Sequence, residues 1–239
     1  MTSPTHYFER VSSTMDVLHQ LAAEGAVSGT AVAASEQLQG RGSRGRTWHS
    51  PVGGLWLSVL FRPAAAEGVE VISVRVGLAV ADAIQGLVPE PLQLKWPNDL
   101  MLQGRKVGGV LCEARWQGEA LAWVAVGVGM NVRNTVPDEL DGVAMSLATL
   151  EPRITLEEIT DPILAALREL DVGAARLSGA ELERFARRDW LRGRTISAPV
   201  AGTVRGVAQD GALVVQTAVG RDVSLRGGSV ELAAVSHSG

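Results

Sequence analysis

This 239-residue sequence has only one cysteine and no excess of positive charge. The single cysteine, Cys112, cannot form an internal disulfide, and the N-terminal residues have neither the positive region nor the apolar region of a secretory signal. We therefore expect a cytoplasmic protein. The formal net charge of -4 argues against broad binding to DNA or RNA, because nucleic-acid-binding surfaces are usually basic.

Long uninterrupted hydrophobic runs are absent as well. The most helix-like apolar stretch, residues 69–87, is broken by Arg75 and Asp82, so it falls short of the roughly 18 apolar residues that span a bilayer. We expect no membrane association. The hydrophobic content of 46% is ample for a packed core, and it predicts an ordered globular protein of one large domain, or one domain with a small appendage.

Lysine is unusually rare. Of the 22 basic residues only Lys95 and Lys106 are lysine, and they lie eleven positions apart. A chain that uses arginine almost everywhere else has reason to keep lysine where a compact point charge is needed, because a planar guanidinium cannot replace it there. Chance is the alternative explanation. We favour a functional role, because both lysines lie beside turn-rich segments.

The segment with the most unusual composition runs from Gln37 to Ser58 and places arginines between glycines. Glycine lets the backbone approach a ligand closely and adopt positive φ. Arginines that follow one another with no acid among them suit an anion. The residues concerned are Gly40, Arg41, Gly42, Arg44, Gly45 and Arg46.

These glycines also match the dinucleotide-binding pattern G-x-G-x-x-G, which requires a strand before it and a helix directly after it. Pro51, Gly53 and Gly54 exclude such a helix, and residues 55–61 are typical of a strand, so a loop between two strands fits better. A nicotinamide-dependent oxidoreductase would also need an acidic ribose-binding residue about 20 positions further on. The nearest one, Glu67, has no predicted strand before it.

Periodicity and turn residues predict the order of the elements. Ser13 or Thr14 should cap the first helix, Pro89 and Pro91 should end the second, and residues 97–99 should form a turn. From residue 194 the pattern changes to five short β runs, the size of an SH3-like barrel. We expect helices at residues 14–25, 69–87, 155–170 (with a capping box from Thr155 and Glu158) and 179–190, and strands at 29–36, 55–61, 92–96, 106–115 and 120–131.

Three segments occur in the order and spacing of one family: GRGSRGRTWHSP with GGLWLS, then KWPNDL, then GRKVGGVLCE. With VGVGMNV and the terminal β runs after them, the sequence resembles the biotin protein ligase family over essentially its whole length. The resemblance implies an α/β (α+β) fold, with a mixed-sheet catalytic domain at residues 1–190 and an SH3-like β-barrel at residues 191–239.

The resemblance also implies the reaction. Biotin and ATP would give biotinyl-5'-adenylate and pyrophosphate, with Mg²⁺ as the metal, and a lysine of a biotin carboxyl carrier domain of a carboxylase would then accept the biotinyl group. We keep a homodimer as a further expectation. Some members carry an N-terminal winged helix that binds DNA, but only about a dozen residues precede the first predicted helix here, so we expect no DNA-binding function.

By resemblance, Lys106 bridges the biotin carboxylate and the α-phosphate, and Arg41, Arg46 and Lys95 are the other catalytic residues. Joining a carboxylate to a phosphate gathers negative charges, so fixed cations are what the chemistry needs. Arg44 lies in the same loop, and both Arg44 and Arg46 are expected at the nucleotide. The alternative for Arg44 is a surface arginine on a mobile loop.

The resemblance also places the KWPND segment at the nucleotide. Expected contacts are Lys95, Asn98 and Asp99, together with Trp48 and Asn131. Asp99 would serve Mg²⁺ directly or through water, and Asn131 offers a donor and an acceptor to an adenine edge. The alternatives are an Asx-turn aspartate with a paired lysine, and a plain strand-end turn.

Biotin is an apolar bicycle with a polar ureido group, so its pocket should be hydrophobic with a few hydrogen-bond partners. Capping alone could explain one of the two residues Ser13 and Thr14, and Cys112 is expected to pack in the core. The positions that match the family's biotin site are Ser13, Thr14, Gln37, Gly40, Arg41, Trp48, Lys106, Gly109 and Leu111.

The chain departs from the family at two positions. Met15 stands where asparagine is common, and Ser43 stands where a second arginine usually contributes to retention of the adenylate. A lipoate ligase, which shares the fold and the adenylating logic, is the nearest alternative function, and a non-catalytic binding module built on the β-barrel is a further one.

Overall fold

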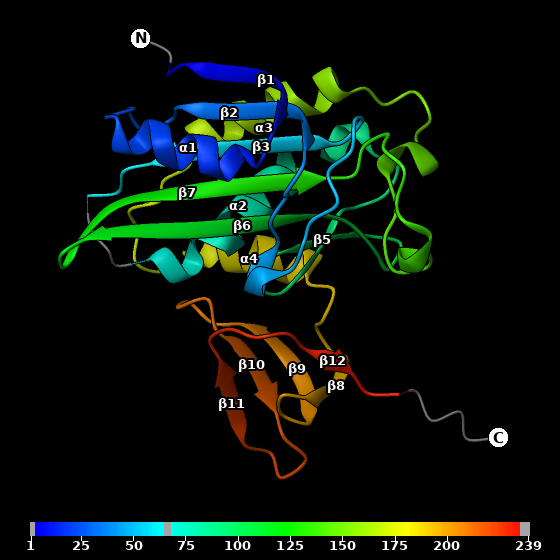
Figure 1. Ribbon diagram of the computed structural model, residues 1–239. Helices are drawn as coiled ribbons and strands as arrows, with labels where there is room; N and C mark the ends of the chain where they lie inside the picture. The colour runs from blue at the N-terminus through cyan, green and yellow to red at the C-terminus, as the bar shows by residue number, and fades with distance from the viewer. Residues whose placement is uncertain (1–2, 65–67, 235–239) are drawn as a thin grey trace.

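The structure, a computed structural model that describes residues 3–64 and 68–234, is organised around one seven-stranded mixed sheet (Figure 1). Strand β1 runs parallel to β2, whereas the other neighbours pair antiparallel. The predicted mixed sheet is confirmed, and Glu67 lies outside the described residues. The strands lie in the order β1 (Thr5–Val11), β2 (Ala31–Gln37), β3 (Leu55–Phe61), β7 (Ala120–Met130), β6 (Arg105–Gln117), β5 (Asp99–Leu102) and β4 (Gln93–Lys95).

Helices cover both faces of this sheet (Figure 1). Helix α1 (Thr14–Ala23) packs over β2, β3 and β7 on one face, whereas α2 (Val69–Ala83), α3 (Leu156–Arg168) and α4 (Gly179–Arg188) cover the other. All seven residues of β3 are buried, which is why its sequence is apolar without alternation. None of the helices in the described part of the chain is long and apolar enough to cross a membrane.

The predicted helix starts are confirmed. Ser13, not Thr14, caps α1 by accepting a hydrogen bond from the Met15 amide at 3.3 Å, and Thr155 and Glu158 form the predicted capping box of α3. The predicted end of the second helix was wrong. Helix α2 ends at Ala83 and a 3-10 turn follows at Gln85–Leu87, where glycine disfavours further α-helix, before either proline is reached.

Two strands were not predicted. Strand β1 has mostly exposed residues and no clean alternation, so its sequence carries little signal. Strand β5 begins at Asp99, in the stretch predicted as a turn, and pairs with β6 through a tight connection at Gln103 and Gly104, both of which have positive φ. The turn lies at residues 96–98, one position earlier than predicted, because β-pairing with β4 and β6 takes in Asp99.

The five predicted C-terminal β runs are confirmed as one antiparallel sheet, and its closure into a barrel stays a prediction. Its order is β11 (Asp222–Leu225), β10 (Leu213–Gln216), β9 (Gly202–Val207), β8 (Thr195–Ala198) and β12 (Glu231–Leu232).

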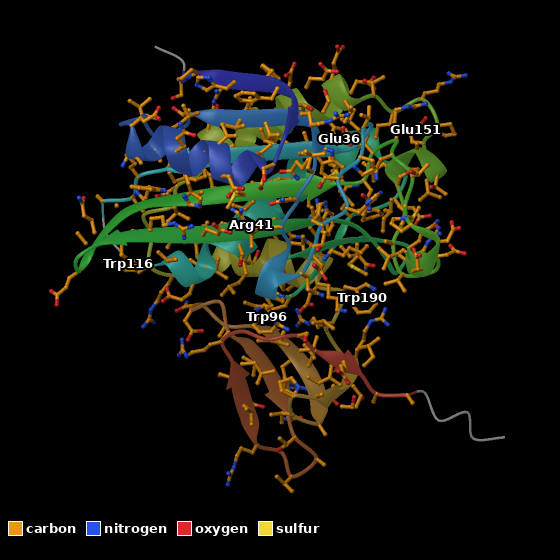
Figure 2. The ribbon with its side chains drawn as sticks, viewed as in Figure 1. Glu36, Arg41, Trp96, Trp116, Glu151 and Trp190 are labelled. Atoms are coloured by element: carbon orange, nitrogen blue, oxygen red, sulfur yellow. The ribbon has the colours of Figure 1, made fainter. Side chains whose placement is uncertain are left out.

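A buried junction joins the two sheets. The Trp96 indole donates to the Gly211 carbonyl at 2.9 Å, and the Trp190 amide donates to the Leu94 carbonyl at 3.0 Å. Figure 2 shows Trp96 and Trp190 between the main body and the C-terminal sheet. One hydrophobic core runs from Leu94 on the main sheet to Val215 on the small one. The boundary at residues 190 and 191 stays a prediction.

Asp189 at this junction makes folding pH-dependent. Its Oδ1 accepts from the Leu191 amide at 2.9 Å, while its buried Oδ2 accepts from no group in the described residues. Burial raises the pKa of this carboxyl to about 6, although the Leu191 and Arg192 amides oppose the shift. The folded state therefore holds a proton between about pH 4 and 6 that the unfolded chain has released, and stability falls as the pH rises through this window.

We expect Asp189→Asn to remove this dependence. The gain in the free energy of unfolding, relative to the native sequence, should grow from pH 4.5 to pH 7 and reach at most about 3 kcal/mol. Urea unfolding at pH 4.5, 5.5 and 7 measures it. Stability profiles that run parallel in the two proteins would contradict the assignment.

Candidate active site

A cavity of about 310 Å³ opens where β3, β6 and β7 meet the start of α1. The arginine loop, residues 40–49, and a strap, residues 136–144, complete its wall. Most of the residues predicted for the site are brought together here, although they are far apart in the sequence. Those that line the cavity are Ser13, Thr14, Gln37, Arg41, Arg46, Trp48, Asn98, Lys106, Gly109, Leu111 and Asn131.

One part of the cavity wall is polar. Gln37 Oε1 accepts from the Thr14 amide at 2.8 Å and from the Thr14 hydroxyl at 3.0 Å. The Thr14 hydroxyl also lies 2.7 Å from Ser58 Oγ, and Gln37 Nε2 donates to Ser50 at 2.9 Å. Because Ser13 is the helix cap, capping explains Ser13, and Thr14 is left to serve this polar group.

Strand β7 contributes two glycines that sequence reasoning did not single out. A Cβ at Gly129 would lie 2.8 Å from Trp48 Nε1 and would displace the ring, and one at Gly127 would lie 3.1 Å from Met15 Sδ and would press on that side chain. Their spacing of two residues puts both on the same face of the strand. That spacing in VGVGM was the available signal for a wall against which a ring packs.

Lys106 brings an ammonium group to the cavity wall. Its Nζ forms an ion pair with Asp99 Oδ1 and lies 4.9 Å from the centre of the Trp48 ring. The strap and the residue after it fix the Lys106 backbone, because the Lys106 amide donates to the Val143 carbonyl at 2.8 Å and the Lys106 carbonyl accepts from the Met145 amide at 2.9 Å. The buried Trp48 Nε1 has no hydrogen-bond acceptor among the described residues and lies against the Gly129 position of β7.

Lys95 does not join Lys106. Although Lys95 lies directly opposite Asp99 in the β4–β5 pair, its ammonium lies 5.2 Å from the centre of the Trp190 ring, at the junction with the C-terminal sheet. Asp99 pairs with the other lysine instead. Within the described residues, the predicted site residues Lys95, Asp99, Gly40 and Arg44 lie outside the lining of the cavity.

Gly40 and Arg44 shape the arginine loop rather than the cavity wall. A Cβ at Gly40 would collide with Ser50 Oγ and the Trp48 carbonyl, so only glycine fits there. Arg44 has a positive φ of 62° and donates to Ser229 Oγ at 2.7 Å, which joins the loop to the C-terminal segment. Neither of the two open readings of Arg44, a nucleotide contact or a surface arginine, includes this link.

Arg46 and Arg41 are the loop arginines that line the cavity. Arg46 folds back within the loop, donating to Ser43 Oγ at 3.0 Å and to the Ser43 carbonyl at 3.3 Å. Arg41 pairs with Asp16 and Glu113. Burial alone would lower the pKa of Arg41, but the two carboxylates outweigh it and raise the pKa, so the guanidinium is charged.

Two asparagines border the cavity. Asn98 Nδ2 donates to the Val110 carbonyl at 2.6 Å, and the Val110 amide donates back to the Asn98 carbonyl at 2.9 Å, which anchors the KWPND segment on β6. Asn131 Oδ1 accepts from Asn134 Nδ2 at 3.0 Å. The Asn131 acceptor is thus partly used, while the apolar strap beside it supplies Val136, Pro137 and Leu140 to the lining.

Among the described residues, no cluster of three or more His, Cys, Asp or Glu side chains could hold a metal ion. The carboxylate predicted to serve Mg²⁺, Asp99, is single and already paired with Lys106. Such a donor set suits a Mg²⁺ ion that arrives with nucleotide phosphates and keeps most of its waters, rather than a resident ion.

Comparison with known proteins gives a consistent match. The family model described as the biotin/lipoate A/B protein ligase family matches residues 7–131. A biotin–[acetyl-CoA-carboxylase] ligase from Paracoccus denitrificans is 34% identical over 213 residues, which are 82% of this chain and 88% of that protein. The bifunctional ligase/repressor BirA from Bacillus subtilis is 35% identical over 147 residues, 59% of this chain, and the chain covers 45% of that protein's length.

Solved structures agree in fold. A biotin protein ligase from Aquifex aeolicus in complex with biotin and ATP is 25% identical, with a TM-score of 0.79, and the match covers 96% of this chain and 98% of that one. A biotin protein ligase from Leishmania major in complex with biotinyl-5-AMP has a TM-score of 0.64 and 27% identity, and covers 92% of this chain and 98% of that one.

Proposed function

The chain belongs to the biotin/lipoate A/B protein ligase family, and on that premise we propose that it is an ATP-dependent biotin protein ligase. It would join biotin and ATP into biotinyl-5'-adenylate, release pyrophosphate, and pass the biotinyl group to a lysine of a biotin carboxyl carrier domain. ATP and biotin are the substrates, and Mg²⁺ enters as the metal of the nucleotide.

The observation that carries the proposal is the position of Lys106. It is a point charge held at the wall of a largely apolar cavity, between the Trp48 ring and Asp99. Activating a carboxylate with a nucleotide brings the carboxylate oxygen to the α-phosphorus, and the two negative groups repel. A fixed ammonium at their meeting point lowers this cost, and its benefit grows as charge builds up on the phosphate in the transition state.

The polar part of the wall supports biotin over lipoate as the acid. Thr14 and Gln37 present hydroxyl and amide groups to the cavity, and a ureido ring can exchange hydrogen bonds with both. The dithiolane ring of lipoate offers no such partners, and a site built to hydrogen-bond its substrate rejects an analogue that lacks the polar group. Trp48, Gly109 and Leu111 would form the apolar wall.

The nucleotide would lie toward Asn98, Asn131 and the strap, with Arg41 and Arg46 over the adenylate. The strap supplies apolar surface for a purine ring, and Asn131 keeps donor capacity for its edge. Gly40, Arg44, Lys95 and Asp99, which lie outside the cavity lining, stay predictions as substrate contacts. A homodimer, the absence of DNA binding and a cytoplasmic location also stay predictions.

The direct test is to incubate the protein with biotin, Mg-ATP and a carboxylase carrier domain. We expect the carrier to gain the mass of one biotinyl group, and the gain to require both biotin and ATP. Pyrophosphate exchange with biotin or lipoate as the only acid separates the two activities. Exchange that runs faster with lipoate would overturn the choice of substrate.

A further inference from the structure

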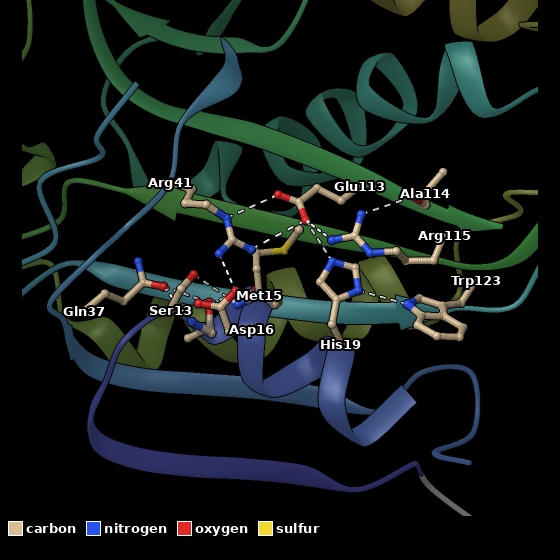
Figure 3. Close-up of polar contacts among 12 residues, drawn as sticks. Ser13, Met15, Asp16, His19, Gln37, Arg41, Glu113, Ala114, Arg115 and Trp123 are labelled. Atoms are coloured by element: carbon tan, nitrogen blue, oxygen red, sulfur yellow. Dashed lines mark hydrogen bonds and ion pairs between the residues drawn. The ribbon is translucent and has the colours of Figure 1, made fainter. Parts of the chain in front are cut away.

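Four hydrogen-bonded side chains form a row that begins at Trp123 on β7 and ends at Arg41 in the cavity lining (Figure 3). Trp123 Nε1 donates to His19 Nδ1 at 2.9 Å, and His19 Nε2 lies 2.8 Å from Glu113 Oε2. Glu113 then accepts from Arg41, at 3.3 Å for Nε to Oε1 and 3.5 Å for Nη2 to Oε2. The four residues come from β7, α1, β6 and the arginine loop, so the row forms only in the folded protein.

The hydrogen bond from Trp123 determines which ring nitrogen of His19 is the acceptor. An indole N–H can only donate, so the His19 Nδ1 atom must be the acceptor. In the neutral imidazole the proton then lies on Nε2, which donates to Glu113. His19 therefore has one partner for each ring nitrogen, and its side chain is only 12% exposed. The ring is held in one orientation.

The Glu113 side chain stays charged. The hydrogen bond from His19 is the largest influence on the pKa of this carboxyl and lowers it, and the charges of Arg41 and Arg115 lower it further, against the opposing effect of burial. Glu113 is thus a fixed carboxylate whose side chain is 20% exposed. A carboxylate in this setting can hold an arginine far better than an exposed one can.

Glu113 orients Arg41 and still leaves some of its N–H groups free for a ligand. A guanidinium has five N–H groups. Glu113 takes one from Nε and one from Nη2, and Asp16 takes one from Nη1. One N–H on each terminal nitrogen remains for a ligand, and Arg41 lines the cavity. A side chain already ordered loses less conformational freedom when the ligand arrives.

We propose that Glu113 is a positioning residue that holds the Arg41 guanidinium at the cavity, and that His19, oriented by Trp123, holds Glu113 in turn. The proposal rests on the proposed function, in which Arg41 meets the anionic groups of biotinyl-5'-adenylate. Asp16 contributes less than Glu113, because its side chain is 48% exposed and its pairing competes with water.

Biotin-dependent pyrophosphate exchange tests the proposal in four variants. Glu113→Gln and His19→Phe should each raise the KM for biotin by about tenfold, the value of one charge-assisted hydrogen bond, with a smaller change in kcat. His19→Gln, whose amide can donate to Glu113 and accept from Trp123, should restore most of the affinity. Glu36→Gln is the matched control, because Glu36 pairs with the exposed Arg10 at 2.6 Å, and it should change neither constant.

A second readout does not depend on activity. In ¹⁵N-labelled ligand-free protein, the Arg41 Nε–H signal, assigned with Arg41→Lys, should exchange slowly with water, and it should weaken in Glu113→Gln but not in Glu36→Gln. If the native protein binds no biotin, the proposed function fails. The Arg41 signal still shows whether Glu113 holds the Arg41 guanidinium. An unchanged KM and an unchanged signal in Glu113→Gln, or equal losses in the two His19 variants, would overturn the positioning role.

Discussion

Lys106→Arg is expected to reduce biotinyl-adenylate formation by about a hundred- to a thousandfold, the usual cost of removing one preorganised donor from a transition state. The charge is kept, but the shape is not. The ammonium lies 4.9 Å from the centre of the Trp48 ring and pairs with Asp99, and a Cβ at the neighbouring Gly109 would lie only 3.5 Å from Nζ. A longer, planar guanidinium cannot occupy this space and still face both reacting groups.

Pyrophosphate exchange at saturating biotin and ATP measures this first half-reaction, with thermal unfolding as the check that the variant is folded. Lys95→Arg is the informative comparison. Lys95 lies against Trp190, and a guanidinium can also stack on an aromatic ring, so this variant should lose less than about tenfold. A folded Lys106→Arg protein that exchanges pyrophosphate as fast as the native one would remove Lys106 from the reaction.

Local signals in the sequence predicted most of the fold. Helix starts were readable because caps act within four residues, as Thr155 and Glu158 do, and β3 was readable because burial on both faces requires a continuous apolar run. Strand β5 was missed because no local signal marks its start. The Pro-Asn-Asp sequence that ends at Asp99 is typical of a turn, and only pairing with β6 makes Asp99 part of a strand.

Prediction of the site succeeded and failed for similar reasons. Residues such as Trp48 and Lys106 were predicted because they lie in contiguous motifs, although two of these motifs also carry predicted residues that lie outside the cavity lining. The positioning of Arg41 by Glu113 was not predicted, because Glu113, His19 and Trp123 are brought together only by the sheet and α1. Its one sequence signal was the single acid of β6, Glu113, which follows the apolar run at residues 107–112. Lys95 was grouped with Lys106 on proximity in sequence, whereas its side chain lies on the Trp190 ring.

Ser43→Arg is expected to slow the escape of biotinyl-5'-adenylate by about ten- to a hundredfold, the value of hydrogen bonds from a charged group. Ser43 lines the cavity, at a position where the resemblance described above leads us to expect an arginine. Its hydroxyl accepts from Arg46 Nη2 at 3.0 Å but brings no charge to the ligand. With an uncharged residue at this position, the native loop should release the reactive anhydride more readily.

Escaped adenylate acylates amines, yet few amines of this protein would be acylated. Its lysines are Lys95, which lies 5.2 Å from the centre of the Trp190 ring, and Lys106, which is paired with Asp99. Self-labelling should therefore be slight even when release is fast. The assay needs a lysine-rich bystander protein that is incubated with enzyme, biotin and Mg-ATP. Intact-protein mass spectrometry then measures its labelling.

Bystander labelling should fall in Ser43→Arg, while the mass of the enzyme barely changes in either protein. Ser43→Ala separates the two properties of the site, because it removes the hydroxyl acceptor of Arg46 without adding a cation. If retention depends on charge at position 43, the alanine variant should label bystanders at least as strongly as the native protein. Equal labelling by the native protein and Ser43→Arg would mean that retention lies elsewhere in the loop, with Arg44 and its hydrogen bond to Ser229 as the next place to test.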